Sequence, residues 1–340
     1  MFELAMQKEH YRIFEEPMII FSAIREGLRR VTASPKLILF LWLFNFVMAL
    51  PLTLLMSGQI ESSLGASLVS EKMQKSFDLD WYEEFNHSAG ALGKTFSPAV
   101  IGVGPFLGNL ESWLTGSLFA NYAGIVGLGL GYMIIWMFLL GGILDRFAHR
   151  EERLTMERFF SASGRYFLRF VTLAVLSGVL YFLVCGFIAP QLFALIAEST
   201  RDTTVEKTVF FMTAGAYLVV AFLLMLINMI FEYAKIATVV HDQRNGFAAV
   251  LNGVQFVFSH PAKTFGLYLA LGVFLLVGLG VYSIVAPGAN QSSVINITLT
   301  FLLGQIFLVM KLIMRLTFFG GQMALYETMT ERMEPAPATV

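Results

Sequence analysis

The stretch that decides the fold is "TVFFMTAGAYLVVAFLLMLINMIF" at residues 208–231, followed directly by "EYAKIATVV" at 232–240. The first part is 24 residues without a charge, or about 36 Å of helix at 1.5 Å per residue. That length exceeds a hydrocarbon core of about 30 Å, so it predicts a membrane-spanning helix. Glu232 and Lys235 then belong at the membrane boundary. We expect "IATVV" to continue as helix beyond the lipid and to pack on amphipathic helices from other parts of the chain.

The composition points to an integral membrane protein. The 340 residues are 56% hydrophobic and only 14% charged, with a mean hydropathy of +0.69, whereas a soluble domain carries roughly 25% charged residues. The net charge of −1 argues against nucleic-acid binding. The single cysteine, Cys185, lies in an apolar run, and we expect a buried, inert thiol there.

Long uncharged runs predict the membrane spans. The run from 264 to 310 is long enough for two spans and is broken by the turn-forming "APGANQSS" at 286–293. The first run starts at Leu37, too late and too long for a cleavable signal peptide, so it reads as a retained anchor. Six spans are predicted near 37–56, 121–144, 168–195, 209–231, 264–285 and 295–316. The expected fold class is an all-α, polytopic membrane helix bundle.

The distribution of Lys and Arg predicts the orientation. With the N-terminus inside, 18 of these residues fall in cytoplasmic segments and five fall outside. This bias places both termini in the cytoplasm. The expected organisation is a cytoplasmic amphipathic segment at 1–36, a six-span domain at 37–331 with an outer segment at 57–118, and a disordered tail at 332–340.

A repeated pattern suggests three copies of one unit, an amphipathic helix followed by two spans. Ala23, Gly27, Val31 and Pro35 of "AIREGLRRVTASPKL" recur as Ala249, Gly253, Val257 and Pro261 of "AVLNGVQFVFSHPAK". A weaker copy, "SASGRYFL" at 161–168, matches "TASPKLIL" at 32–39, with Gly164 in place of proline. The second spans of the first and third copies end alike, in "LLGGIL" at 139–144 and "FFGGQM" at 318–323. Chance similarity between apolar helices is the alternative.

The large apolar residues of these segments recur at helical spacing and form the apolar faces of the predicted amphipathic helices, which can lie in the membrane interface. In the first copy they are Ile20, Ile24, Leu28 and Val31, and in the third Phe247, Val250 or Leu251, Val254 and Val257. Arg25, Arg29 and Arg30 lie on the opposite face of the first helix, where they are candidate contacts for anionic headgroups. Pro35 and Pro261 each predict a corner before a span.

The outer segment is the only sizeable piece outside the predicted spans. Trp81 and Phe85 share one face of a predicted helix. Residues 95–109 carry two prolines and three glycines and are too broken for a span. They form either a loop on the outer face, which we favour, or a re-entrant segment. About 60 residues is small for an independent domain, so we expect a lid or cap.

Motifs for chemistry are weak. Asp145 with His149, and His241 with Asp242, could ligand a metal, but neither pair completes a ligand set, so charged, solvated loops are the favoured interpretation. No HExxH motif occurs, and no nucleophile stands beside a plausible base. We therefore expect neither an enzyme nor a bound cofactor.

Few polar residues interrupt the predicted spans. The uncharged ones are Asn45, Asn228, Gln191 and Gln305. No acid lies at the middle of any of the six spans, which weighs against ion-driven transport.

Four charges at the ends of the fourth and sixth spans form a candidate interhelical cluster. They are Glu232, Lys235, Lys311 and Arg315. Both spans run in the same direction, so the charges should lie at one depth, and Glu232 could pair with Arg315 or Lys311. The alternative is that each side chain reaches headgroups separately.

Two stretches carry a family resemblance. "LLGGILDRFAHREERLTMERFFSASGRYFLRF" at 139–170 and "WYEEFNHSAGALGKTFSPAVIG" at 81–102 resemble a family of bacterial polytopic inner-membrane proteins with no assigned activity. The alternation of amphipathic helices and paired spans is also similar to the six-span membrane portion of some glycerophosphodiesterases, whose catalytic domain has no counterpart in this sequence. Neither resemblance implies a functional residue.

Two classes of function remain open. The first is a non-catalytic scaffold, assembly or regulatory component that binds membrane lipids or a partner, either another membrane protein or a second copy of the chain. The second is a permease or lipid-handling protein that uses the interior of the bundle, with 95–109 as an outer gate. A continuous polar or lipid-filled cavity would distinguish the second class from the first.

Overall fold

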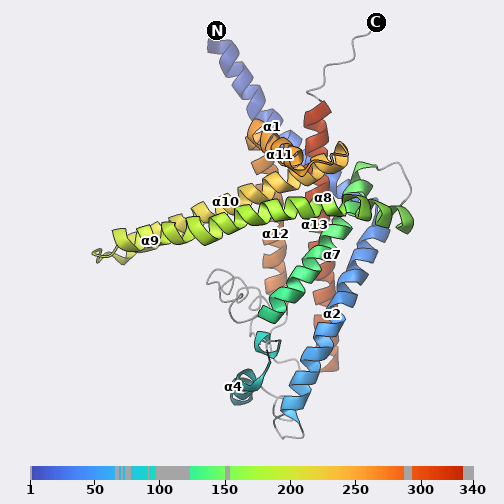
Figure 1. Ribbon diagram of the computed structural model, residues 1–340, viewed down its shortest axis with the longest axis vertical. Coiled ribbons are helices and arrows are strands. Elements are labelled where there is room, and N and C mark those ends of the chain that lie inside the picture. Colours follow the sequence, from blue (N-terminus) through green and yellow to red (C-terminus); the bar gives the residue numbers. More distant parts are fainter. Residues whose placement is uncertain are drawn as a thin grey trace. The chain divides into compact units, whose positions relative to one another are not determined.

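The computed structural model describes residues 2–65, 69, 72, 78–90, 92–96, 123–149, 154–286 and 293–331, with only the backbone described for 2–15 and 123–126 (Figure 1). Every regular element within these ranges is a helix. The chain forms two compact units. The predicted tail at 332–340, the turn residues 287–292 and most of 95–109 lie outside the described residues.

Within the described residues, six helical segments are long and apolar enough to cross a membrane, which agrees with the predicted number. They are α2 (Pro35–Leu64), α7 (Ala123–Ala148), the continuous α8–η2–α9 (Met156–Leu183, Val184–Ile188 and Ala189–Ser199), α10 (Glu206–Val240), α12 (Pro261–Val285) and α13 (Val294–Glu331). The remaining described elements are α1 (Phe2–Thr32), α4 (Leu79–Ser88), the short 3₁₀ helix η1 (Gly93–Thr95) and α11 (Gly246–Ser259). The protein is thus a polytopic membrane helix bundle.

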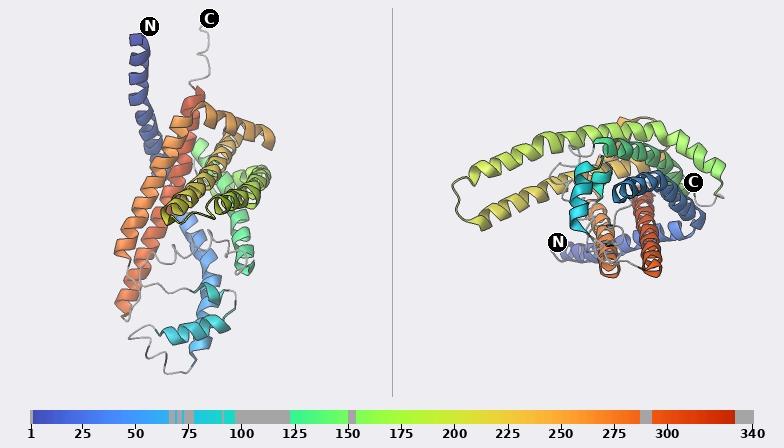
Figure 2. Two further views of the ribbon diagram at one scale, coloured as in Figure 1. Left: turned by 90° about the vertical axis from the view of Figure 1, so that its left-hand side faces the viewer. Right: turned by 90° about the horizontal axis from the view of Figure 1, so that it is seen from below.

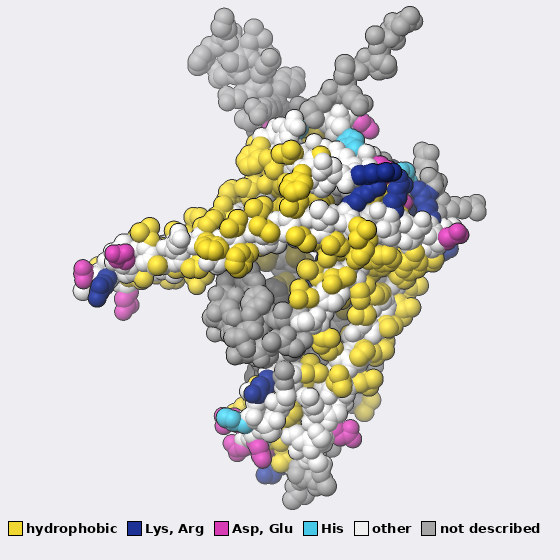
Figure 3. All heavy atoms as spheres, viewed as in Figure 1, with side chains coloured by type: hydrophobic (Ala, Val, Ile, Leu, Met, Phe, Trp, Pro, Cys, Tyr) yellow, Lys and Arg dark blue, Asp and Glu magenta, His cyan; other side chains and the backbone are white. Residues whose placement is uncertain are grey.

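The first unit contains the described parts of Met1–Arg30, Trp136–Tyr268 and Phe318–Val340. Within it, α8–α9 and α10 run side by side as a long hairpin (Figures 1 and 2). Hydrophobic side chains cover the visible face of this hairpin, and charged side chains gather at its tip (Figure 3). An apolar surface of this kind suits lipid, which takes the place of protein contacts.

Helix α10 changes its surroundings at Glu232. Before this residue, large side chains such as Phe211 and Leu218 are exposed, whereas Ile236, Ala237 and Val239 are almost completely buried. The helix continues unbroken to Val240. The prediction that "IATVV" continues as a packed helix is therefore confirmed.

Three close helix crossings hold the first unit together, each at small residues that let two backbones approach. A methyl group added to Gly253 of α11 would lie 2.5 Å from the Ile230 carbonyl oxygen of α10. One added to Gly320 of α13 would lie 3.0 Å from Cα of Gly27 on α1. One added to Gly141 of α7 would lie 3.1 Å from Cα of Ser163 on α8.

The apolar faces of the amphipathic helices are only partly buried. Leu28 and Leu251 are exposed, at 44% and 67%. The buried stripes are Ala23, Gly27 and Val31 on α1 and Ala249, Gly253 and Val257 on α11, the residues that match between the two copies. Close approach of a neighbouring helix requires small side chains, so these stripes face the crossings and the larger residues turn outward.

Both predicted corners occur, and the middle copy has none. Ser34, between α1 and α2, has φ −126° and ψ 57°, and His260, between α11 and α12, has φ −131° and ψ 51°. In the middle copy α8 runs without interruption through Gly164. Gly164 carries an N–H that proline lacks, so it can continue a helix where proline cannot.

The second unit contains the described parts of Val31–Ile135 and Leu269–Thr317. Polar side chains tie its spans together: Trp42 Nε1 donates to Gln305 Oε1 at 3.0 Å, and the Tyr132 hydroxyl donates to Asn45 Oδ1 at 2.7 Å. These bonds join α2 to α13 and α2 to α7.

Helix α4 belongs to the outer segment and packs within the second unit. Trp81 and Phe85 are buried and stacked with ring centroids 5.2 Å apart, which confirms their predicted shared face. Gly93 of η1 lies against Phe85 and against Gln59 of α2.

Cys185 is exposed, so the prediction of a buried thiol was wrong. It lies in the π-helical turn Val184–Ile188, within the third spanning segment. In a span, lipid tails supply the apolar surroundings that protein supplies in a soluble core, so an apolar run does not imply burial in protein.

Candidate functional site: polar groups at the span ends

Arg30 is the centre of a buried polar group in the first unit. Its side chain is 2% exposed, and its guanidinium lies 2.5 Å from Glu327 Oε2 on α13. The same group donates to the backbone oxygen of Phe147 at 3.2 Å and lies 3.4 Å from Glu26. Arg30 therefore connects α1, α7 and α13, with an acidic partner to offset the cost of burying its charge.

The three arginines predicted to contact headgroups separate in the structure. Arg25 is exposed, and the Arg29 side chain is 71% exposed while it pairs with Glu26 at 2.8 Å. Arg30 points inward, so the prediction was wrong for this residue. Arg30 follows Gly27 of the buried stripe by three residues, which is most of one helical turn, so its side chain emerges beside that stripe. The Arg29 side chain emerges on a different face of the helix.

Glu232 is half-buried and accepts hydrogen bonds from two side-chain amides. Asn228 Nδ2 donates to one carboxylate oxygen at 3.1 Å, and Gln322 Nε2 of α13 donates to the other at 2.6 Å. Asn228 also lies 2.6 Å from the Tyr268 hydroxyl of α12. The carboxylate thus joins α10 to α13, and Asn228 links both to α12, all within the first unit.

The other members of the predicted charge cluster belong to different units. Lys235 is half-buried in the first unit, and Lys311 and Arg315 are exposed on α13 in the second. Arg315 also interacts with the Tyr132 hydroxyl of α7. Pairing of Glu232 with Arg315 or Lys311 stays a prediction.

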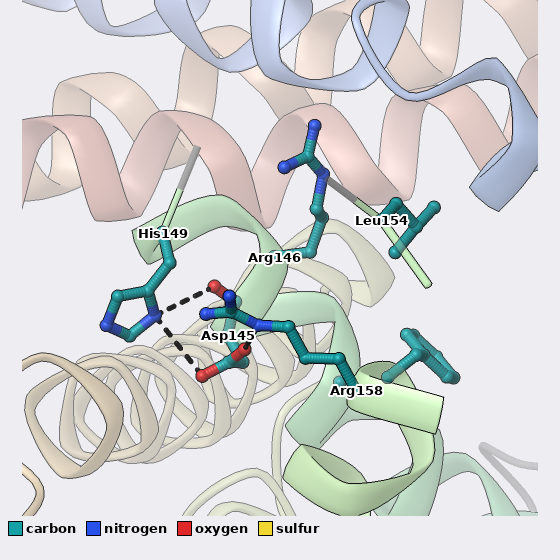
Figure 4. Close-up of a pocket in the computed structure, with 7 residues that line it drawn as sticks. Asp145, Arg146, His149, Leu154 and Arg158 are labelled. Carbon is teal, nitrogen blue, oxygen red and sulfur yellow. Dashed lines mark hydrogen bonds and ion pairs between the residues drawn. The ribbon is translucent and has the colours of Figure 1, made fainter. Parts of the chain in front are cut away.

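Asp145, His149 and Arg158 converge on a small hollow between the end of α7 and the start of α8 (Figure 4). Arg158 Nε and His149 Nδ1 lie 3.4 Å and 3.2 Å from the Asp145 carboxylate oxygens. The space open to the centre of a water-sized sphere is about 10 Å³, room for about one water molecule. The hollow can hold a water molecule but not an organic substrate.

Asp242 and His241, the second pair considered for a metal, have other partners. Asp242 bonds Arg169 at 2.7 Å and Arg165 at 2.6 Å, and these arginines hold the pKa of its carboxyl below the ordinary value, with Arg169 as the main cause. His241 Nε2 lies 3.1 Å from the Tyr326 hydroxyl. Among the described residues, no group of three or more His, Cys, Asp or Glu side chains is placed to hold a metal ion.

The sequence interpretation missed several partners in these groups. The partners lie far away in the chain, as Glu327 does from Arg30 and Gln322 does from Glu232. One signal was available: Asn228 stands four residues before Glu232, a spacing at which helix side chains meet. Asn45 and Gln305, noted as polar residues within spans, both bond neighbouring spans.

Comparison of the chain with family models, curated proteins and solved structures finds no match. The resemblances to an inner-membrane family and to the membrane portion of glycerophosphodiesterases therefore stay predictions. The polar groups at the span ends and the exposed helix faces are the remaining basis for a function.

Proposed function

We propose that the protein is a non-catalytic component of the bacterial inner membrane, with both termini in the cytoplasm. In this proposal it acts as a scaffold, assembly or regulatory component whose amphipathic helices bind the cytoplasmic leaflet. The 18-to-5 distribution of Lys and Arg supports the orientation. The hollow beside Asp145, with room for about one water molecule, offers no substrate pocket.

The observation that carries the proposal is the outward face of the amphipathic helices. Phe21 of α1 is 69% exposed, and Phe247 and Leu251 of α11 are both 67% exposed. His260 alone separates α11 from the span α12. Because α11 joins a span through this one residue, the end of α11 lies at the membrane surface. Large apolar side chains there can enter the headgroup region.

Three contacts support the repeated architecture as part of the proposal. The second span of each copy crosses the amphipathic helix of the next: α7 crosses α8, α10 crosses α11, and α13 returns to α1. Ser163 occupies the place of Gly27 and Gly253 in this series, whereas the sequence match had aligned it with Ser34. The two registers differ by seven residues, or about two helical turns, which preserves the helix face.

Photo-cross-linking tests the lipid contact. A benzoylphenylalanine placed at Leu251 in the full chain should form adducts with phospholipid in the native membrane. The control is the same group at Phe256, which is buried and already aromatic, so the group there should cross-link within the chain. Adducts from position 251 to another protein would favour the partner-binding form of the proposal, and the lack of any external adduct would contradict both forms.

A permease is the alternative function, and the Glu232 group is the observation that favours it. An ionisable residue that is hydrogen-bonded to polar groups on its own span and on a neighbouring one is a common feature of ion pathways. Purified protein in liposomes that contain a pH-sensitive dye tests this alternative. A proton flux that Glu232→Gln abolishes would support a permease, and equal flux in liposomes with and without protein would reject proton conduction.

A further inference from the structure

Lys311 and Arg315 stand at a change in the surroundings of α13. Before them, Val294, Leu299 and Ile306 are at least half exposed, and after them Leu316 and Thr317 are buried. The exposed part has the apolar surface of a lipid-facing span. The two cations therefore mark the level at which the helix leaves the hydrocarbon region.

The two cations share one face of the helix. Positions four apart lie one above the other, and both side chains are exposed, whereas Leu312 and Leu316 on another face are buried. A long cationic side chain at this level can extend to the headgroup region while its methylene groups stay in apolar surroundings.

A fixed polar group completes this surface. The Tyr132 hydroxyl of α7 interacts with Arg315 and donates to Asn45 Oδ1 of α2. Asn45 in turn donates to the Leu41 backbone oxygen at 2.7 Å. Its amide is thereby held in one orientation, and it orients the phenol toward the arginine.

We propose that Lys311 and Arg315 bind the headgroup phosphate of an anionic phospholipid, with the Tyr132 hydroxyl as the group that orients Arg315. The guanidinium can donate two parallel hydrogen bonds to phosphate oxygens, and the lysine supplies a second positive charge. Basic pockets between spans on the cytoplasmic side suit such headgroups. This site deepens the proposed function, because it names a lipid class and a position on α13 separate from the outward faces of α1 and α11.

Lipid titration of the full chain in detergent, followed by native mass spectrometry, tests the site. The probes are phosphatidylglycerol and, for comparison, zwitterionic phosphatidylcholine. The double variant Lys311→Gln/Arg315→Gln should bind phosphatidylglycerol about thirtyfold more weakly, since each cation near an anionic membrane contributes about one kcal/mol. Its binding of phosphatidylcholine should change by no more than about twofold.

Arg201→Gln/Lys207→Gln, at the tip of the α9–α10 hairpin, is the matched control. It removes the same charge from two exposed positions and should leave phosphatidylglycerol binding unchanged. Arg315→Lys keeps the charge but loses the two parallel hydrogen bonds, so its binding should fall between that of the wild type and that of the double variant. An equal loss in the control and in the double variant, or no loss in either, would overturn the site.

The result is independent of the Leu251 cross-link. If Leu251 forms no lipid adduct but the double variant still loses phosphatidylglycerol, the proposed membrane contact of α11 is wrong and the site on α13 stands. If Leu251 cross-links lipid and the double variant binds normally, the site is wrong and the proposed function stands. Thermal stability of each variant without added lipid shows whether a loss reflects unfolding.

Discussion

Arg30 and Arg29 are neighbours in the chain with opposite surroundings. The Arg30 side chain is 2% exposed and ion-paired with Glu327, whereas the Arg29 side chain is 71% exposed. Burial of a guanidinium is tolerated only where acceptors replace water, and here a carboxylate and a backbone oxygen do so. The contribution of a charged residue to this fold thus depends on which helix lies opposite it.

Replacing Arg30 should destabilise the protein. Arg30→Met removes the charge, takes a hydrogen bond from the Phe147 oxygen and leaves Glu327 without this partner. We expect a loss of about 2 kcal/mol in the free energy of unfolding, less than for a fully buried pair because Glu327 is 23% exposed. Unfolding in mixed micelles with increasing SDS measures the change. Arg29→Gln is the control, and an equal loss there would show that Arg30 has no special role.

The Asp242 pairs should make stability depend on acid pH. Their contribution is complete above the carboxyl pKa of the unfolded chain and is lost as pH falls through the lowered pKa of the folded protein. Wild type should therefore be more stable than Asp242→Asn at neutral pH, and the difference should shrink below about pH 4. Asn tolerates the φ of +47° at this position, so the backbone is unchanged. A difference in melting temperature that stays constant from pH 7 to pH 3 would contradict this assignment.

Helix crossings show which parts of an element are sensitive to change. Helix α11 is only 14 residues long, near the lower limit of stability for an isolated helix. Its Asn245 cap, with Oδ1 accepting from the Phe247 N–H at 3.0 Å, helps it begin, and its contact with α10 holds it in place. Gly164 of α8 has open space around it, whereas Gly253 of α11 lies against the backbone of α10.

Two Gly→Ala variants should have opposite effects. Gly253→Ala places its methyl group against the Ile230 oxygen and should cost about 2 kcal/mol through overpacking. Gly164→Ala meets nothing within 4 Å and should raise stability by about 0.5–1 kcal/mol through lower backbone entropy in the unfolded chain. SDS unfolding of both proteins measures the changes. If both variants are stabilised, the close crossing of α10 and α11 does not occur.

Six long apolar helices, together with the amphipathic helices α1 and α11, make up most of the part of the molecule that the structure describes. The long helices α10 and α13 continue past their apolar, exposed parts into buried ends. In these ends, most of the residues that follow Glu232 and Arg315 are buried. The orientation in the membrane and any energetic coupling between Glu232 and Arg315 are properties of the whole molecule.

Cysteine accessibility tests the orientation in a Cys185→Ser background. A cysteine at Ser88 of α4 should react with an impermeant thiol reagent added outside intact cells, because α4 belongs to the predicted outer segment. A cysteine at Ser161, near the start of α8, should react only after the cells are opened. The reverse pattern would show that both termini lie outside.

A double-mutant cycle tests whether Glu232 and Arg315 act together. Glu232 already accepts from Asn228 and Gln322, and the proposed lipid site assigns Arg315 to a phosphate. We therefore expect the losses from Glu232→Gln and Arg315→Gln to add within about 0.5 kcal/mol in SDS unfolding. A double variant that loses clearly less than the sum would instead support direct pairing of the two residues and remove Arg315 from the lipid site.

Sequence alone was sufficient for the helical class, the number of spans and the continuation of α10 beyond Glu232. These properties depend on local quantities: the length of an apolar run, the spacing of charges and the restriction before a proline. Even the matched residues Ala23, Gly27 and Val31 proved to be the packed ones, since small residues are needed where backbones meet.

Packing between distant segments determined the rest. The burial of Arg30, the amide donors on Glu232 and the exposure of Leu251 and Cys185 could not be predicted from neighbours in the chain. A helix repeats its faces every few residues, and an apolar residue on any face can meet either protein or lipid. Only the position of a second helix decides between the two, and that helix lies up to 297 residues away for Arg30 and Glu327.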